Sequence, residues 1–312
     1  MMTLMTPITP MSPIALPESV VIRDVGPRDG LQAEAPVAVA DRVRLIDALI
    51  DAGVTCIELC SFVSPKAVPS MAGAAEVVSG VGVRDGIRRT ALVPNLRGAQ
   101  MAMEAGVDEL SVTISASSVY SEKNTKMTID EAVSSVEAIA SFVDGGVPID
   151  VVLSCSFGSP YEGEISVADV ARLADRVLGG GATCVTLADT TGMATPRRVN
   201  DVLRALSASA RAGVGMHLHE TRGTGLVNAY AAMQFGVRRF DTSVGGLGGS
   251  PFAAGAAGNL ATEDLVYLCD DLGVATGINL GRLLAASKLT AAIVGRSVPS
   301  RVAAAGPRLT EG

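Results

Sequence analysis

Apolar runs of strand length alternate with longer helical patterns eight times along the chain, and this repeat limits the fold more than any other feature. Strands separated by helices run parallel, because each helical crossover returns the chain to the same edge of the sheet. Eight such units close a single (β/α)₈ barrel of the TIM type. The strands are expected at 20–25, 55–62, 90–94, 109–115, 149–156, 184–189, 214–219 and 239–244.

A doubly wound open sheet is the competing architecture. Such a sheet usually has a glycine-rich phosphate turn after its first strand, whereas this chain has GPRDGLQ there. No domain boundary is evident within the repeat. We therefore expect a disordered Met/Pro-rich tail over 1–18, one barrel domain over 19–295 with additional C-terminal helices, and a flexible tail over 296–312.

Charge and composition exclude several classes of protein. The net charge is −7 and no long run of one sign occurs, which argues against nucleic acid as the main partner. No uninterrupted apolar stretch is long enough to span a membrane, and the first eighteen residues lack the Lys and Arg of a targeting signal. The five cysteines form no CxxC motif, so reduced thiols in a cytoplasmic protein are the simplest interpretation.

The only two histidines of the chain, His217 and His219, stand at the end of the seventh expected strand. Residues two apart on a strand point to the same side of the sheet, so both rings can reach one point. In a TIM barrel the ends of all strands open into one mouth, where Asp29 after the first strand could add a carboxylate ligand. The alternative is a pair of core histidines bonded to the backbone.

Other polar residues follow the strands in the same way. Glu58 lies in an apolar run, with Arg28 as its obvious partner, and an ion pair that serves only structure is as plausible as a catalytic role. Asp189 begins a DTTG turn that also places a carboxylate at the mouth. Asn259 ends a glycine-rich loop and offers an oxygen to a hard ion such as Mg²⁺ or Mn²⁺.

Together these segments resemble the hydroxymethylglutaryl-CoA lyase family, within the metal-dependent TIM barrels named for a DRE motif. The resemblance runs from about residue 21 to about residue 284. Its strongest stretches are VGPRDGLQAE, IELCSFVSPKAVPSM, SCSFGSPYEG, HLHETRGTGLVNA and GGLGGSPFAAGAAGNLATEDLVY.

The resemblance implies a metal-dependent cleavage of the C2–C3 bond of 3-hydroxy-3-methylglutaryl-CoA, or of a related branched 3-hydroxyacyl-CoA. The products would be acetyl-CoA and a keto acid, and the enzyme would be a homodimer. The implied metal ligands are Asp29, His217, His219 and Asn259. Arg28 would neutralise the enolate oxygen, Glu58 and Asp189 would support and relay protons, and Gln32 and Ser61 would contact the substrate.

Three positions depart from the family pattern. Ser250 replaces the cysteine that donates a proton in the family's GGCP loop, and a hydroxyl is a much weaker acid than a thiol. Ala35 stands where the family has a lysine that contacts CoA. Arg222 follows HxHET where many relatives have an aromatic residue; it could pair with a substrate carboxylate or a CoA phosphate, or remain a solvated loop charge.

Two alternatives remain open. A Claisen-type condensing enzyme or an aldolase of the same superfamily would share RDG and HxH, but it usually lacks the GGLGG–PFAAGA–GN loop. A barrel that binds acyl-CoA with little turnover would explain Ser250. The retention of every metal ligand argues against that second alternative.

Overall fold

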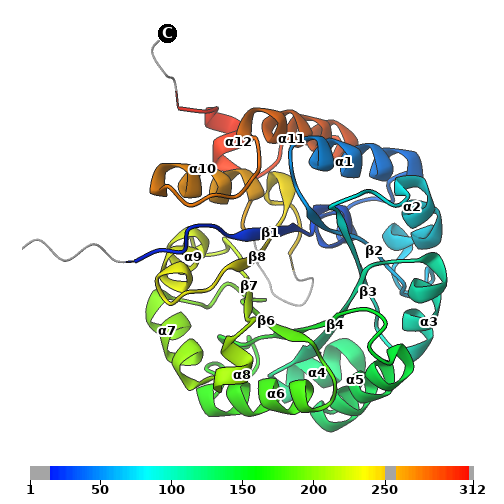
Figure 1. Cartoon of the computed structure of the whole chain (residues 1–312), viewed down its shortest axis with the longest axis vertical. Helices are drawn as coiled ribbons and strands as arrows, with labels where there is room; N and C mark the ends of the chain where they lie inside the picture. The colour runs from blue at the N-terminus through cyan, green and yellow to red at the C-terminus, as the bar shows by residue number, and fades with distance from the viewer. Residues whose placement is uncertain (1–14, 250–257, 309–312) are drawn as a thin grey trace, which may run out of the picture.

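The structure, a computed structural model, describes residues 15–249 and 258–308. Its strands form a closed parallel barrel in the order β1 to β8, and helices surround it (Figure 1). Each neighbouring pair is hydrogen-bonded in parallel, including β8 with β1. The (β/α)₈ barrel predicted from the sequence is confirmed.

The eight strands overlap the eight expected runs. They are β1 (Val21–Asp24), β2 (Cys56–Ser61), β3 (Arg88–Leu92), β4 (Glu109–Ser115), β5 (Ile149–Ser154), β6 (Cys184–Ala188), β7 (Gly215–His217) and β8 (Arg239–Thr242). Strand β7 ends at His217, two residues before the expected end. The chain leaves the barrel ladder there because His219 forms an isolated antiparallel bridge with Asn259.

The helices that follow the strands are α1 (Val39–Asp51), α2 (Ala74–Val81), α3 (Leu96–Ala105), α4 (Ser118–Thr125), α5 (Ile129–Val143), α6 (Val167–Gly179), α7 (Pro196–Ala205), α8 (Ala208–Arg211) and α9 (Gly225–Gln234). The sequence pattern did not predict α4, which has no apolar repeat. Its start is fixed by Ser117, whose side chain accepts a hydrogen bond from the Tyr120 amide. None of the helices in the described ranges is long and apolar enough to cross a membrane.

The additional helices are α10 (Thr262–Leu272), α11 (Leu280–Val294) and α12 (Arg301–Ala305). They pack against one another, and α11 also packs against α1 (Figure 1). Helix α12 belongs to the segment that we expected to be a flexible tail. Helix α12 is held in place because Asp264 of α10 accepts hydrogen bonds from Ser300 and from the Val302 amide, each at 2.9 Å.

One apolar core fills the space between the barrel and the helices. Every residue of β2 and β5 is buried, because one face of a barrel strand points inward and the other contacts helices. The five cysteines are unpaired, and four of them are buried. Of the N-terminal tail expected over 1–18, residues 1–14 lie outside the described part of the chain.

Candidate active site

The carboxyl ends of the strands surround a cavity of about 190 Å³. Six residues predicted from the sequence lie near it in one cluster. Arg28, Asp29, Gln32, Glu58, His217 and His219 all line the cavity. The mouth of the barrel therefore brings together groups that are almost two hundred residues apart in the chain.

Arg28 and Asp29 sit on one tight turn directly after β1. The turn is a single π-helical loop, η1 (Gly26–Gly30), in which the Val25 carbonyl oxygen accepts hydrogen bonds from the amides of residues 28, 29 and 30. Gly26 is required by close packing, since a Cβ there would stand 2.8 Å from both an Asp24 oxygen and a Val244 methyl group. The GPRDG motif thus aims two charged side chains into the mouth.

Three of the predicted ligands meet in a geometry that suits a metal ion. One donor atom each of Asp29, His217 and His219 lies within 4.8 Å of the others. The two Nε2 atoms are 3.2 Å apart, and Nε2 of His217 lies 4.0 Å from the Asp29 carboxylate. Neighbouring ligands of an octahedral ion, bound at about 2.1 Å, stand about 3.0 Å apart. The two imidazole nitrogens match that spacing.

Asn259 completes this group from the far end of the glycine-rich loop. Its amide nitrogen donates to Asp29 at 2.7 Å, and its oxygen Oδ1 is buried without a partner among the described residues. An unpaired buried acceptor is costly, so it indicates a missing ligand. Gly248 of the same loop has a φ of +104°, and a Cβ there would lie 2.4 Å from the Asn259 amide nitrogen and 3.3 Å from Asp29. Only glycine leaves this space open.

The charge states of His219 and Asp29 are also suited to metal binding. Burial and, to a smaller extent, the charge of the neighbouring His217 lower the pKa of His219 to about 4. His217 behaves in the opposite way: although burial opposes it, a hydrogen bond and the charge of Asp241 raise its pKa. Burial likewise opposes ionisation of Asp29, but the Arg28 charge holds its pKa below the usual value. His219 and Asp29 are therefore in their metal-binding protonation states at neutral pH.

Asp241 of β8 contacts a candidate metal ligand and lines the cavity, and the sequence interpretation missed it. Its carboxylate lies 3.2 Å from Nδ1 of His217, which leaves Nε2 of that ring for the metal. Its signal was a buried position in an expected strand, although the charged and polar neighbours of Asp241 make this signal weaker than that of Glu58. Asp241 is 6% exposed and it also lines the cavity.

Arg28 and Glu58 form the ion pair expected from the sequence. Nε of Arg28 donates to Glu58 at 2.5 Å, and Nη1 donates to Asp29 at 2.6 Å. These two contacts fix the plane of the guanidinium beside the metal ligands. Within the described ranges no hydrogen bond engages Nη2, so part of the fork is free to bind a substrate oxygen.

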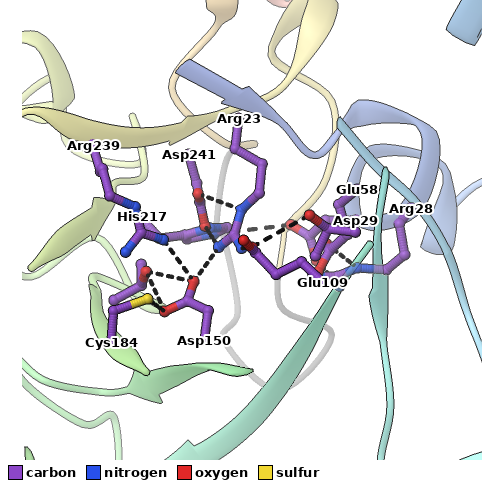
Figure 2. Close-up of polar contacts among 12 residues, drawn as sticks. Arg23, Arg28, Asp29, Glu58, Glu109, Asp150, Cys184, His217, Arg239 and Asp241 are labelled. Atoms are coloured by element: carbon purple, nitrogen blue, oxygen red, sulfur yellow. Dashed lines mark hydrogen bonds and ion pairs between the residues drawn. The ribbon is translucent and has the colours of Figure 1, made fainter. Parts of the chain in front are cut away.

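Below the cavity, Arg23 stands at the centre of a buried charge network (Figure 2). It donates to both oxygens of Asp241 at 2.8 Å, and it forms ion pairs with Asp150 at 2.8 Å and Glu109 at 3.1 Å. Burial opposes ionisation of Asp241, but Arg23 keeps its pKa well below the usual range. Arg23 and its partners thus hold the negative charge of Asp241 next to His217.

The remaining predicted residues stand apart from the cavity lining. The carboxylate of Asp189 accepts the amides of Met193 and Ala194 at 2.7 and 2.9 Å, and burial raises its pKa to about 7. Ser61 is buried at the end of β2, and its hydroxyl has no partner among the described residues. Arg222 donates to the Thr191 and Gly192 carbonyl oxygens at 2.8 Å, and these two hydrogen bonds stabilise the conformation of the loop after β6.

Ser250 lies outside the described residues, and so does the rest of the loop up to residue 257.

The opposite side of the cavity was not predicted from the sequence. It is lined by Tyr120 and Asn124 of α4 and by side chains of β3 to β6. These residues are neutral, and nothing in their local pattern distinguishes them from ordinary strand or helix residues.

The chain was compared with known proteins. Residues 19–290 match the family model described as HMGL-like. Hydroxymethylglutaryl-CoA lyase, mitochondrial, of Macaca fascicularis is 42% identical over 94% of this chain and 91% of that protein. The 3-hydroxy-3-isohexenylglutaryl-CoA/hydroxy-methylglutaryl-CoA lyase of Pseudomonas aeruginosa is 40% identical over 93% of this chain and 98% of that protein.

A solved structure agrees with these sequence relatives. It is an HMG-CoA lyase of Acinetobacter baumannii in complex with coenzyme A and 3-methylmalate, and it superposes with a TM-score of 0.88. Its sequence is 40% identical, and the match covers 95% of this chain and 97% of that one. The fold, the family model and the identity over nearly the whole length agree: the chain belongs to the HMGL-like family.

Proposed function

We propose that this chain is a divalent-metal-dependent carbon–carbon lyase. It cleaves 3-hydroxy-3-methylglutaryl-CoA, or a related branched 3-hydroxyacyl-CoA, to acetyl-CoA and acetoacetate or the matching keto acid. The observation that carries the proposal is the convergence of Asp29, His217 and His219 next to Arg28 in one cavity. The relatives named as lyases for such thioesters, and the neighbour that holds coenzyme A, support the substrate class.

The reaction needs three tasks. A proton must leave the C3 hydroxyl, the electron pair of the C2–C3 bond must pass into the thioester as an enolate, and C2 must then take up a proton. Arg28 is suited to the enolate, because its guanidinium is fixed by Glu58 and Asp29 and retains free donors. We assign proton support and relay to Glu58 and Asp189, and substrate contacts to Gln32, Ser61 and Arg222.

Mg²⁺ or Mn²⁺ is the proposed metal, held by Asp29, His217, His219 and Asn259. Carboxylate and amide oxygens favour hard ions, and the two imidazoles are compatible with Mn²⁺. When bound, such an ion would polarise the C3 hydroxyl and so favour loss of its proton. The residues of this chain orient that hydroxyl and stabilise the opposite end of the breaking bond.

Ser250 is the proposed proton donor to C2, in the place of the family's cysteine.

The family resemblance also supports a homodimer, which sedimentation analysis can test. Five unpaired thiols support a cytoplasmic location. The acyl-CoA is the proposed partner of this site, and the dispersed charge gives no reason to expect nucleic acid.

The test is a coupled assay of acetyl-CoA release. The purified protein is given Mg²⁺ or Mn²⁺ and a panel of branched 3-hydroxyacyl-CoA thioesters. We expect cleavage by the wild type and faster cleavage by Ser250→Cys, because a thiol is the stronger acid. We expect His217→Ala to lose both activity and bound metal. If neither wild type nor Ser250→Cys cleaves any thioester, the lyase proposal is wrong; if His217→Ala retains the metal, the metal site is wrong.

A further inference from the structure

The cavity has an ionisable half and a neutral half. Its ionisable side chains come from β1, β2, β7, β8 and the turns after them, and they are Arg28, Asp29, Glu58, His217, His219 and Asp241. Its neutral side chains come mainly from β3 to β6, among them Leu92, Thr113, Val152 and Ala188. Because the barrel closes in chain order, β5 stands opposite β1. A ligand held by the metal ligands therefore faces the neutral half.

Three apolar residues of that half, Leu92, Val152 and Ala188, are called here the apolar wall. Val152 is its central residue, since β5 lies between β3, which carries Leu92, and β6, which carries Ala188. Val152 is 8% exposed, whereas its neighbours Val151 and Leu153 are 0% exposed. Alternate residues of a strand point to opposite faces, so Val152 points into the barrel, and its exposed surface belongs to the cavity.

The chemistry of the proposed substrate indicates what this wall contacts. Carbon 3 carries a hydroxyl group, a thioester arm, a carboxymethyl arm and one alkyl group. The first three carry oxygen, and the ionisable half offers them metal ligands and the Arg28 guanidinium. The alkyl group has no partner there, but each methylene moved from water to an apolar surface improves binding about fourfold.

We propose that the apolar wall binds the C3 alkyl group and that Val152 sets the size of group that is accepted. This proposal rests on the proposed function, because it assumes a ligand that reaches the metal ligands through its oxygens. It assigns to Val152 a role in specificity rather than in catalysis. Substitutions at residue 152 should therefore change which substrate is preferred.

The experiment measures binding, so that it does not depend on turnover. Titration calorimetry with Mg²⁺ gives the dissociation constants of 3-hydroxyglutarate, 3-hydroxy-3-methylglutarate and 3-hydroxy-3-butylglutarate. The proteins are the wild type, Val152→Phe, Val152→Ala and the control Val151→Ala, which changes the outward face of the same strand. Cleavage of the corresponding CoA thioesters is measured in parallel.

We expect Val152→Phe to weaken binding of the butyl ligand by at least about tenfold more than binding of 3-hydroxyglutarate, which has only hydrogen at this position. Val152→Ala should favour the butyl over the methyl ligand relative to wild type, and Val151→Ala should leave the ratio unchanged. If both Val152 variants leave the ratios unchanged, or if no diacid binds the wild type, the proposal is wrong. If the expected binding pattern occurs without cleavage, the wall is supported and the lyase proposal fails.

Discussion

At the scale of single residues, Asp241 has the clearest structural reason to affect metal binding. Its carboxylate lies 3.2 Å from Nδ1 of His217, and it accepts hydrogen bonds from Nε and Nη2 of Arg23. Carboxylates that orient a ligating histidine typically contribute tenfold to a hundredfold to metal affinity. We expect Asp241→Asn to weaken Mn²⁺ binding by roughly that factor, because the amide loses the charge that orients the Nδ1–H of the ring.

Metal titration by calorimetry or paramagnetic resonance measures this loss directly. The matched control is Asp270→Asn, which removes an exposed carboxylate from α10 and should leave the affinity unchanged. Circular dichroism reports whether the variant keeps its fold. An affinity equal to that of the wild type in folded Asp241→Asn would show that the contact with His217 has no role in metal binding.

At the scale of elements, the docking of α12 depends on one side chain of α10. Asp264 accepts hydrogen bonds from Ser300 and from the amides of residues 301 and 302. The same segment covers the start of the glycine-rich loop, because the Ser300 amide donates to the Gly245 carbonyl oxygen at 2.9 Å. Loss of the carboxylate leaves buried donors unpaired, at a cost of about 1–3 kcal/mol.

We therefore expect Asp264→Ala to raise amide hydrogen exchange in residues 297–306 while the barrel strands stay protected. Mass spectrometry of exchanged peptides measures this difference. Asp271→Ala is the control, since its ion pair with Arg308 at 2.8 Å also ties α10 to the C-terminal segment but is exposed and weak. Equal exchange in the two variants would contradict a special role for Asp264.

The repeat of strand and helix predicted the elements well where packing determines them. Helices α3 and α6 each carry an apolar stripe and are followed by a glycine, so their limits can be predicted from local sequence. Helix α4 was missed because a capping serine, and not an apolar stripe, determines it. The expected range of β7 was too long because His219 pairs with Asn259, forty positions away in the sequence, and does not continue the barrel strand.

At the scale of the whole molecule, closure of the barrel is what makes the site. The cluster of Asp29, His217 and His219 could be predicted because HxH and RDG are local patterns at strand ends. The network around Arg23 could not, since its partners come from β4, β5 and β8 and meet only when the barrel closes. The neutral half of the cavity escaped prediction because its residues look like ordinary strand and helix residues.

Closure also buries carboxyl groups whose ionisation should affect global stability. Glu263 is 0% exposed and accepts the Gly245 amide with both oxygens, at 2.9 and 3.1 Å. Burial raises its pKa from 4.5 to about 7, and the charge of Asp24 acts in the same direction. Between those pH values the folded state holds a proton that the unfolded state has lost, so stability falls as the pH rises through this window.

Glu263→Gln removes this titration, because an amide stays neutral at every pH. The wild type should lose up to about 3 kcal/mol through Glu263 between pH 4.5 and 7, and the variant should lose correspondingly less. The measurement is the difference in unfolding midpoint between pH 5 and pH 8. Glu104→Gln on the exposed surface of α3 is the control and should behave like the wild type. A variant whose midpoint shifts with pH as much as that of the wild type would mean that Glu263 does not hold its proton in the fold.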